Sequence, residues 1–266
     1  MRRVRAVARL AHAVAHGVHG LAIVLFEFRS LDAAARQERI RWWSRKMLAV
    51  LGIAFEHDGT PAESGSLLVA NHISWLDIMA IHAVVPRARF VSKADVKAWP
   101  LVARLVDSAG TLYLERERKR DALRVVHAVA AALSAGQVVA IFPEGTTSTG
   151  HGLLPFHANL LQAAIATATP VQPVALRFSE AANAVSEAVE FVGATSLMRS
   201  LWQTSCGDGV RVRLAFLAPR PSAHVDRREL ATLLRADIAA ALGIDPDTAP
   251  ATGRLGSPAA TLGDAR

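Results

Sequence analysis

The stretch SLLVANHISWLD, residues 66–77, joins a short apolar run to a group of polar side chains. The run at 66–71 has the length and the continuous apolar character of a strand that is buried on both faces. Beyond it, His72 and Asp77 stand five positions apart around a serine and a tryptophan. Open α/β sheets bind ligands at the carboxyl ends of their strands, so this stretch predicts a central strand that leads into a site.

Apolar runs and helix-like stretches alternate from residue 53 onward. Strands are expected at 53–59, 66–71, 89–93, 111–115, 137–144, 171–177 and 210–218. Helices are expected at 75–85, about 95–107, 119–135, 156–168 and 226–242. This alternation predicts an α/β fold with a mainly parallel central sheet flanked by helices.

The chain divides into three parts by composition. Residues 51–243 carry the α/β pattern of one domain. Residues 1–50 are basic and amphipathic, and residues 244–266 lack periodicity and large apolar side chains. We therefore expect an amino-terminal two-helix membrane-associating motif, an α/β domain and a disordered tail.

The first helix of the amino-terminal motif has two distinct faces. At about 100° per residue, one stripe is polar and the opposite stripe is apolar. The polar stripe comprises Arg5, Arg9, His12, His16, His19 and Glu27, and the apolar stripe comprises Val7, Leu10, Val14, Leu21 and Leu25. The uninterrupted apolar run is shorter than the roughly 20 residues of a simple span, so the pattern predicts a helix that lies in a membrane surface.

A second basic helix is expected at 35–53, where Trp42 and Trp43 stand among arginines. Tryptophans beside cations suit a bilayer interface, and they equally suit a helix packed on the domain. Both readings stay open at this stage.

Charge and composition narrow the function classes. The net charge of +7 favours an anionic partner, and the single cysteine, Cys206, excludes an intramolecular disulfide and a cysteine-rich zinc site. The sequence has no Walker A motif, no dinucleotide-binding glycine fingerprint and no G-x-S-x-G elbow. Nucleic-acid binding would depend on charge alone, so no nucleic-acid partner is predicted, and no metal or cofactor site is predicted either.

The pair His72 and Asp77 allows two interpretations. Ser74 and Asp77 match the S-x-x-D pattern of a helix capping box, which leaves His72 unexplained. Alternatively, His72 lies in the turn after the strand, and Asp77 folds back from the first helical turn to orient its imidazole. The free imidazole nitrogen could then act as a general base on a substrate hydroxyl.

Two further polar groups follow predicted strands. Arg116 comes at the end of the strand at 111–115, where its guanidinium could grip a phosphate. The segment Glu144–Thr147 begins at the last residue of the strand expected at 137–144. Its backbone N–H groups and hydroxyls could form an anion-binding concavity. Glu144 is expected to organise that loop or to pair with Arg116.

Four motifs occur together in the chain: NHISWLD, GTLYLER, FPEGTTS and VQPVAL. In this order and spacing they resemble the glycerolipid acyltransferases of the lysophosphatidic acid acyltransferase type, over residues of about 50–218. The resemblance implies that His72 is the general base and Asp77 its partner. It further implies an acceptor phosphate site made by Arg116 and the loop Glu144–Thr147, with Gly110 in the same substrate-binding motif as Arg116, and an acyl pocket shaped by Pro173. Lys93 stands where family members often have a lysine, so it either borders the site or is a solvated strand end.

The implied activity is transfer of an acyl group from acyl-CoA or acyl-carrier protein to 1-acyl-sn-glycerol-3-phosphate. No cofactor is implied beyond this donor. The expected location is the cytoplasmic side of the cell inner membrane, with peripheral or monotopic attachment. Acylation of another lyso-lipid, such as lyso-ornithine lipid, and a non-catalytic basic module that binds membrane surfaces are the alternatives.

Overall fold

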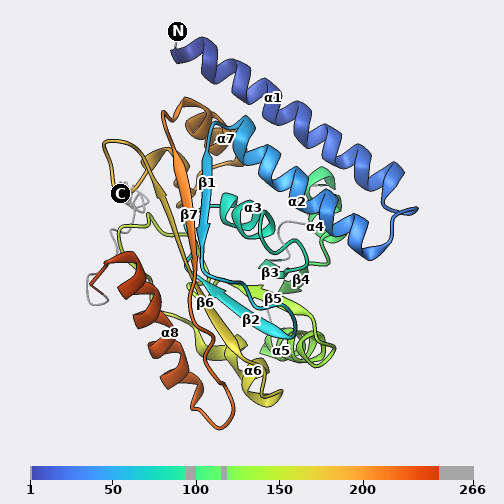
Figure 1. The fold of residues 1–266 in the computed structure, drawn as a ribbon, viewed down its shortest axis with the longest axis vertical. Helices are drawn as coiled ribbons and strands as arrows, with labels where there is room; N and C mark the ends of the chain where they lie inside the picture. Colours follow the sequence, from blue (N-terminus) through green and yellow to red (C-terminus); the bar gives the residue numbers. More distant parts are fainter. Residues whose placement is uncertain (1, 94–99, 115–118, 246–266) are drawn as a thin grey trace, which may run out of the picture.

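The computed structural model describes residues 2–93, 100–114 and 119–245, and its core is one sheet of seven strands in the order β1-β7-β6-β2-β5-β3-β4 (Figure 1). The strands are β1 (Ala54–Asp58), β2 (Ser66–Ala70), β3 (Arg89–Lys93), β4 (Leu112–Leu114), β5 (Val138–Ile141), β6 (Val171–Ser179) and β7 (Arg211–Phe216). Each lies within or close to a strand expected from the sequence. The predicted α/β class and the mainly parallel sheet are therefore confirmed.

Strand β2 lies in the middle of the sheet and pairs in parallel with β5 and β6. Strands β5, β3 and β4 continue the parallel arrangement, and β7 is antiparallel to β6. The carboxyl ends of β2, β5, β3 and β4 consequently meet at one edge. This edge receives the residues that follow each of these strands.

The side chains of β2 explain why its sequence is apolar without alternation. Leu68 and Ala70 belong to an apolar cluster that includes residues of α2 and α3, whereas Leu67 and Val69 belong to a cluster that includes residues of α5, α6 and α8. Both faces of the sheet are thus covered, and all five residues of β2 are buried.

Helices lie on both faces of the sheet (Figure 1). Those that follow the amino-terminal motif are α3 (Leu76–His82), α4 (Pro100–Ser108), α5 (Lys119–Ser134), α6 (Leu161–Ala166), α7 (Leu197–Cys206) and α8 (Arg227–Leu242). Short 3₁₀ turns occur at Ala158–Leu160 and Glu187–Val189. The expected helix at 156–168 is therefore a 3₁₀ turn followed by a short α-helix.

Helix α7 was not predicted from the sequence. Its segment is rich in serine and threonine, but Ser196 caps it by accepting a hydrogen bond from the Arg199 N–H, and Leu197 and Leu201 are spaced by one helical turn. The capping serine and the spacing of the two leucines are the features of the sequence that could have predicted this helix. The predicted disordered tail lies almost entirely outside the described residues and stays a prediction.

The amino-terminal motif consists of two helices, as expected. Helix α1 (Arg2–Ala22) runs into a π-helical segment, Ile23–Glu27, and is followed by α2 (Ala33–Val50). Asp32 caps α2 by accepting from the Ala35 N–H at 2.8 Å. In Figure 1, α1 runs along the top of the molecule, with α2 and α7 beneath it.

Part of the polar stripe of α1 faces the protein. Arg9 donates to the carbonyl oxygen of Gly207 at 2.8 Å, just beyond the last turn of α7, and Arg5 pairs with Asp208 at 2.9 Å. His16 is buried against α2, where its Nε2 lies 3.0 Å from the Trp43 carbonyl oxygen and Trp43 Nε1 donates to the His16 carbonyl at 3.0 Å. Two members of the polar stripe, Arg9 and His16, thus pack on the protein together with the buried Ala6 and Ala13. His12 and His19 of the same stripe are exposed.

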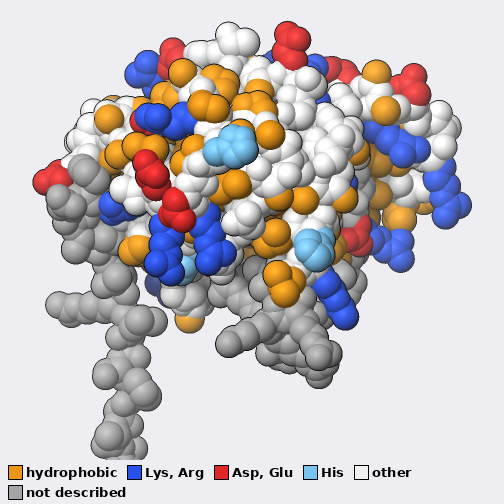
Figure 2. Space-filling view, turned by 90° about the horizontal axis from the view of Figure 1, so that it is seen from below, with side chains coloured by type: hydrophobic (Ala, Val, Ile, Leu, Met, Phe, Trp, Pro, Cys, Tyr) orange, Lys and Arg blue, Asp and Glu red, His pale blue; other side chains and the backbone are white. Residues whose placement is uncertain are grey.

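The outward face of α1 is rich in exposed apolar side chains, which include Val7, Val14 and Leu25 of the predicted apolar stripe, whereas Leu10 and Leu21 are only partly exposed. Phe26 and Val18 have 81% and 61% of their surface accessible. The exposed large apolar side chains of this helix and its π-helical extension are Val4, Val7, Val14, Val18, Leu25 and Phe26. At the opposite end of the molecule, Figure 2 shows charged side chains of both signs interspersed with apolar ones.

Candidate active site

The geometry of His72 and Asp77 is that of a base and its orienting carboxylate. His72 lies in the loop after β2, and Asp77 lies in the first turn of α3. Asp77 Oδ2 is 2.7 Å from His72 Nδ1, and Asp77 is fully buried while the His72 side chain is 19% exposed. An ionised carboxylate only accepts hydrogen bonds, so Nδ1 carries the proton and Nε2 keeps its lone pair.

The same carboxylate oxygen also holds the loop. Asp77 Oδ2 accepts from the Ile73 N–H at 2.7 Å and from the Ser74 N–H at 3.0 Å. The bond to Ser74 is the acidic half of a capping box, whereas the Ser74 hydroxyl is buried and has no hydrogen-bond partner among the described residues. Asp77 therefore combines both interpretations of its spacing, and it fixes the loop and the imidazole together.

The imidazole of His72 stacks on a phenyl ring. The ring centroids of His72 and Phe142 are 4.0 Å apart, and the ring planes are inclined by 10°. Phe142 follows β5 directly, and β5 pairs with β2, so the two rings come from adjacent strand ends. The sequence interpretation assigned no role to Phe142, although it is the first residue of the FPEGTTS motif.

Glu144 holds the backbone of the loop that carries His72. Its two carboxylate oxygens accept from the His72 N–H at 2.7 Å and from the Leu154 N–H at 2.9 Å. The side chain is buried, and this burial raises the pKa of Glu144 to about 7, against the opposing effect of the two backbone hydrogen bonds. These contacts favour the predicted role in loop organisation over contact with substrate.

The loop that follows β5 is hydrogen-bonded to the backbone of His72. The Ser148 N–H donates to the His72 carbonyl oxygen at 2.8 Å, and Thr147 Oγ1 donates to the carbonyl oxygen of Phe191. Gly145 has a φ of +68°, which a side chain would oppose, and Thr146 is exposed. Thr146 is therefore the most exposed residue of this segment, while Gly145 and Thr147 are partly buried.

Asn71 is a further structural contributor that the sequence interpretation missed. Its side-chain amide donates to the Leu176 carbonyl oxygen and accepts from the Leu176 N–H, both at 2.8 Å. This pair of bonds continues the contact between β2 and β6 past the end of β2, and so positions the start of the His72 loop.

The remaining predicted site residues occupy different places. Lys93 ends β3 at the edge of the sheet that also carries His72, whereas Gly110 precedes β4 at the opposite end of these parallel strands. Gly110 has a φ of +72° and accepts from Arg89 Nε at 2.6 Å, which favours a role in that turn. Pro173 is buried in β6 opposite Val69, and Arg116 lies outside the described residues.

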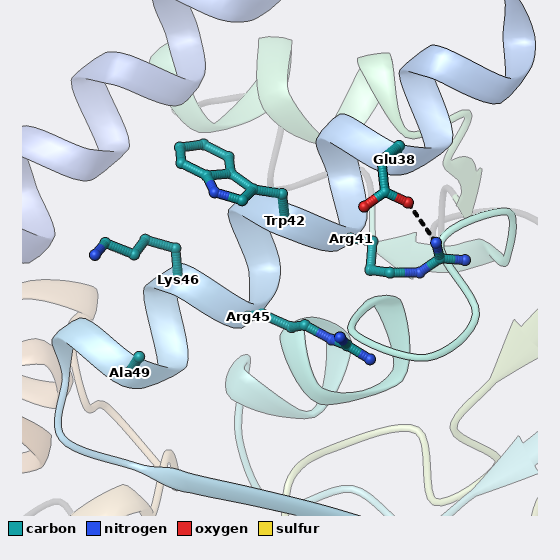
Figure 3. A pocket seen from close by; sticks show the side chains of 6 residues that line it. All are labelled: Glu38, Arg41, Trp42, Arg45, Lys46 and Ala49. Atoms are coloured by element: carbon teal, nitrogen blue, oxygen red, sulfur yellow. Dashed lines mark hydrogen bonds and ion pairs between the residues drawn. The ribbon is translucent and has the colours of Figure 1, made fainter.

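Away from His72, a shallow hollow lies on the outer face of α2 (Figure 3). It has a volume of about 330 Å³ and is lined by Glu38, Arg41, Trp42, Arg45, Lys46 and Ala49. Arg41 pairs with Glu38, and Arg45 Nε donates to the Ala83 carbonyl oxygen at 2.9 Å. The hollow carries an excess of positive charge beside the indole of Trp42.

Within the described ranges, no group of three or more histidine, cysteine or acidic side chains is placed to hold a metal ion.

Fold and site together define an α/β protein with a hydrogen-bonded histidine–aspartate pair at the carboxyl ends of its parallel strands. An acyltransferase family profile matches residues 53–177. A 1-acyl-sn-glycerol-3-phosphate acyltransferase of Neisseria meningitidis serogroup B is 35% identical over 240 residues, which are 86% of this chain and 93% of that protein. A lyso-ornithine lipid O-acyltransferase of Pseudomonas aeruginosa is 37% identical over 197 residues, 74% of this chain and 75% of that protein.

Among solved structures, the 1-acyl-sn-glycerophosphate (LPA) acyltransferase PlsC from Thermotoga maritima has the same fold. The TM-score is 0.71 at 20% identity, and the match covers 91% of this chain and 97% of that one. The chain belongs to the glycerolipid acyltransferase family, of the lysophosphatidic acid acyltransferase type. It is an acyltransferase of phospholipid biosynthesis.

Proposed function

We propose that the protein transfers an acyl group from an acyl thioester, acyl-CoA or acyl-carrier protein, to the sn-2 hydroxyl of 1-acyl-sn-glycerol-3-phosphate. The observation that carries this proposal is the contact of His72 Nδ1 with buried Asp77, which leaves Nε2 as a base on the partly exposed side chain. Within the described residues, Nε2 has no hydrogen-bond partner.

In this reaction His72 Nε2 takes the hydroxyl proton as the acceptor oxygen attacks the thioester carbonyl carbon. An O–C bond forms, the C–S bond breaks, and the departing thiolate takes the proton from the imidazolium. The products are phosphatidic acid and the free thiol. Asp77 keeps the imidazole in the required tautomer and stabilises the imidazolium. The Ser74 hydroxyl is buried, so a covalent acyl-serine at that position is disfavoured.

The acceptor phosphate is assigned to the carboxyl edge beside His72. Lys93 ends β3 at this edge. Arg116 lies outside the described residues and follows the end of β4 by two positions in the sequence. The exposed side of the loop around Thr146 completes this assignment. Phosphate binding by an arginine fork would separate a phosphate-bearing acceptor from one that lacks phosphate.

Membrane contact is assigned to α1 and to the outer face of α2. The residues Arg3–Glu27 are long and apolar enough to span a bilayer, a criterion that core helices of soluble proteins and signal sequences also meet. The polar stripe, however, is used in contacts with α7 and α2, and the apolar side chains point outward. This arrangement suits a helix that lies on the domain with its apolar face in the lipid, on the cytoplasmic side of the inner membrane.

Lyso-ornithine lipid is the second candidate acceptor. The observation that favours it is the 37% identity to the Pseudomonas aeruginosa lyso-ornithine lipid O-acyltransferase. The test is acyl transfer by the purified protein, with each acceptor presented in detergent and thiol release as the readout. We expect faster transfer to 1-acyl-sn-glycerol-3-phosphate; a higher kcat/KM for lyso-ornithine lipid would reverse the assignment.

The same assay tests the base. His72→Ala should abolish thiol release, and Asp77→Asn should lower kcat by roughly 10²–10⁴-fold because the imidazole loses its orienting carboxylate. Thermal unfolding of each variant shows whether the fold survives. Near-normal turnover by a folded His72→Ala variant would remove His72 from the mechanism.

A further inference from the structure

The stack of His72 on Phe142 is closer than the other aromatic contacts of the site. Phe142 also stacks on Phe90, at a centroid distance of 5.7 Å and an angle of 18°, and Phe90 meets His82 edge-on at 4.9 Å. Only Phe142 of these two phenylalanines touches the proposed base among the described residues. Phe142 is half-buried, and its ring covers one face of an imidazole whose edge is held by Asp77.

Two contacts together fix the orientation of the imidazole. The hydrogen bond to Asp77 sets the direction in which Nδ1 points, but it permits rotation of the ring about the line from Nδ1 to the carboxylate. A parallel phenyl face at 4.0 Å opposes that rotation. The combination determines both the plane of the ring and the direction of the Nε2 lone pair, which must meet the acceptor hydroxyl.

The stack also has an electrostatic consequence. The face of a phenyl ring carries partial negative charge and attracts a cation that lies over it within about 6 Å. The neutral imidazole gains little from this face, whereas the imidazolium formed in the transition state gains more. We propose that Phe142 is a positioning residue that holds the His72 ring and stabilises the imidazolium as His72 takes the acceptor proton. This inference depends on the proposed role of His72 as the base.

The test compares Phe142→Leu with Phe142→Tyr and with Phe90→Leu, all in the full-length chain. Leucine keeps an apolar side chain beside His72 and removes the ring face, while tyrosine retains the face. Phe90→Leu is the matched control, because it removes the next ring of the same stack without touching His72. Each variant is assayed for kcat, for both KM values and for the dependence of kcat/KM on pH.

Phe142→Leu should lower kcat by about 3- to 30-fold with both KM values nearly unchanged, since the contact is strongest in the transition state. The acid limb of its pH profile should move to lower pH, because an imidazolium without the ring face forms less readily. If Phe142→Leu acted only by admitting water to the site, the water would stabilise the imidazolium, and the acid limb would move to higher pH. Phe142→Tyr should restore kcat and the profile, and Phe90→Leu should match the parent protein in both.

Three outcomes would overturn the inference. They are an unchanged kcat in Phe142→Leu, an acid limb that moves to higher pH, or equal losses in Phe142→Leu and Phe90→Leu. The proposed function is tested separately by His72→Ala. If His72→Ala is inactive and Phe142→Leu is normal, only the role of Phe142 fails; if His72→Ala is active, the base assignment itself fails.

Discussion

Replacement of Glu144 by glutamine should change how the stability of the fold depends on pH. Burial raises the pKa of this carboxyl from an ordinary value of 4.5 to about 7. Between these two pH values the folded protein holds a proton that the unfolded chain has released. The free energy of unfolding must therefore fall as pH rises through this window, and it should level off above the folded pKa.

The size of the effect follows from the width of the window. Each pKa unit corresponds to about 1.36 kcal/mol, so a shift from 4.5 to about 7 is on the order of 3 kcal/mol across the full range. Glutamine has no proton to release. The stability of Glu144→Gln relative to the parent protein should accordingly increase by about 2–3 kcal/mol between pH 5 and pH 8.

Urea unfolding followed by circular dichroism at pH 5 and pH 8, in one detergent, measures this difference. The exposed Glu63 supplies a matched control, because Glu63→Gln removes the same formal charge from the surface. Parallel pH dependence of Glu144→Gln and the parent protein would refute the reasoning. Activity supplies a second readout: glutamine has one acceptor oxygen for two backbone N–H groups, so the loop that carries His72 should loosen and kcat should fall.

The other predictions concern phosphate, membrane and packing. Arg116→Lys retains charge but loses the guanidinium fork, so the acceptor KM should rise more than the donor KM; equal rises in steady-state assays would remove Arg116 from the phosphate site. Arg9→Met should lower the free energy of unfolding by about 1–3 kcal/mol, because it leaves carbonyl groups at the end of α7 without their donor, and thermal melts against the exposed Arg3→Met control would show this. Serine substitutions on the outer face of α1 should each weaken binding to anionic vesicles by about 1 kcal/mol, so that three together lower the partition coefficient roughly 100-fold in sedimentation while activity in detergent is retained. The positions are Val7, Val14 and Val18. Unaltered sedimentation of the triple variant would place the membrane contact elsewhere.

Substitution on the outer face is a sharper test than removal of α1. Ala6 and Ala13 are buried in the contact of this helix with the domain, and His16 and Trp43 exchange hydrogen bonds across it. Truncation would uncover that contact and would itself create new apolar surface. Loss of vesicle binding after truncation could therefore be masked by the newly exposed side chains.

The sheet could be read from the sequence because each strand is a short apolar run bounded by polar or turn residues. Strand β2 shows this most clearly, since both of its faces are buried and its run has no alternation. Helix α7 escaped prediction because serine and threonine, which have low helix propensity, are interspersed among its apolar residues, and because the helix is held by its contacts with α1. Such a helix depends on tertiary packing, which local propensity does not contain.

The candidate site was predictable where its residues share a single loop. His72 and Asp77 are close in sequence, so their contact follows from one turn of helix and one turn of loop. Phe142 and Glu144 follow the neighbouring strand β5, and their contacts with His72 depend on the order of strands in the sheet. The partners of Glu144 could not be predicted either, because it binds backbone N–H groups, which every residue except proline has.

The orientation of α1 required the structure for a different reason. A periodic pattern separates two faces of a helix, but it does not say which face meets the domain. In a water-soluble protein the large apolar side chains would pack inward, whereas here Arg9, His16 and the small residues Ala6 and Ala13 make the contacts with the rest of the protein. An apolar face left outside is costly in water and favourable in lipid, so the inverted packing is itself an argument for a bilayer partner.

A continuous set of contacts joins this outer helix to the catalytic loop. Arg9 of α1 binds the carbonyl of Gly207 at the end of α7, and Ser200 within α7 accepts a hydrogen bond from Trp75 Nε1 at 3.1 Å. Trp75 lies between His72 and Asp77 in the sequence. A lyso-lipid acceptor keeps its acyl chain in the bilayer, so its hydroxyl can reach the base only at a fixed height above the lipid. The helix proposed to meet the lipid is thus tied, through α7, to the same turn that carries His72, and this tie would set that height.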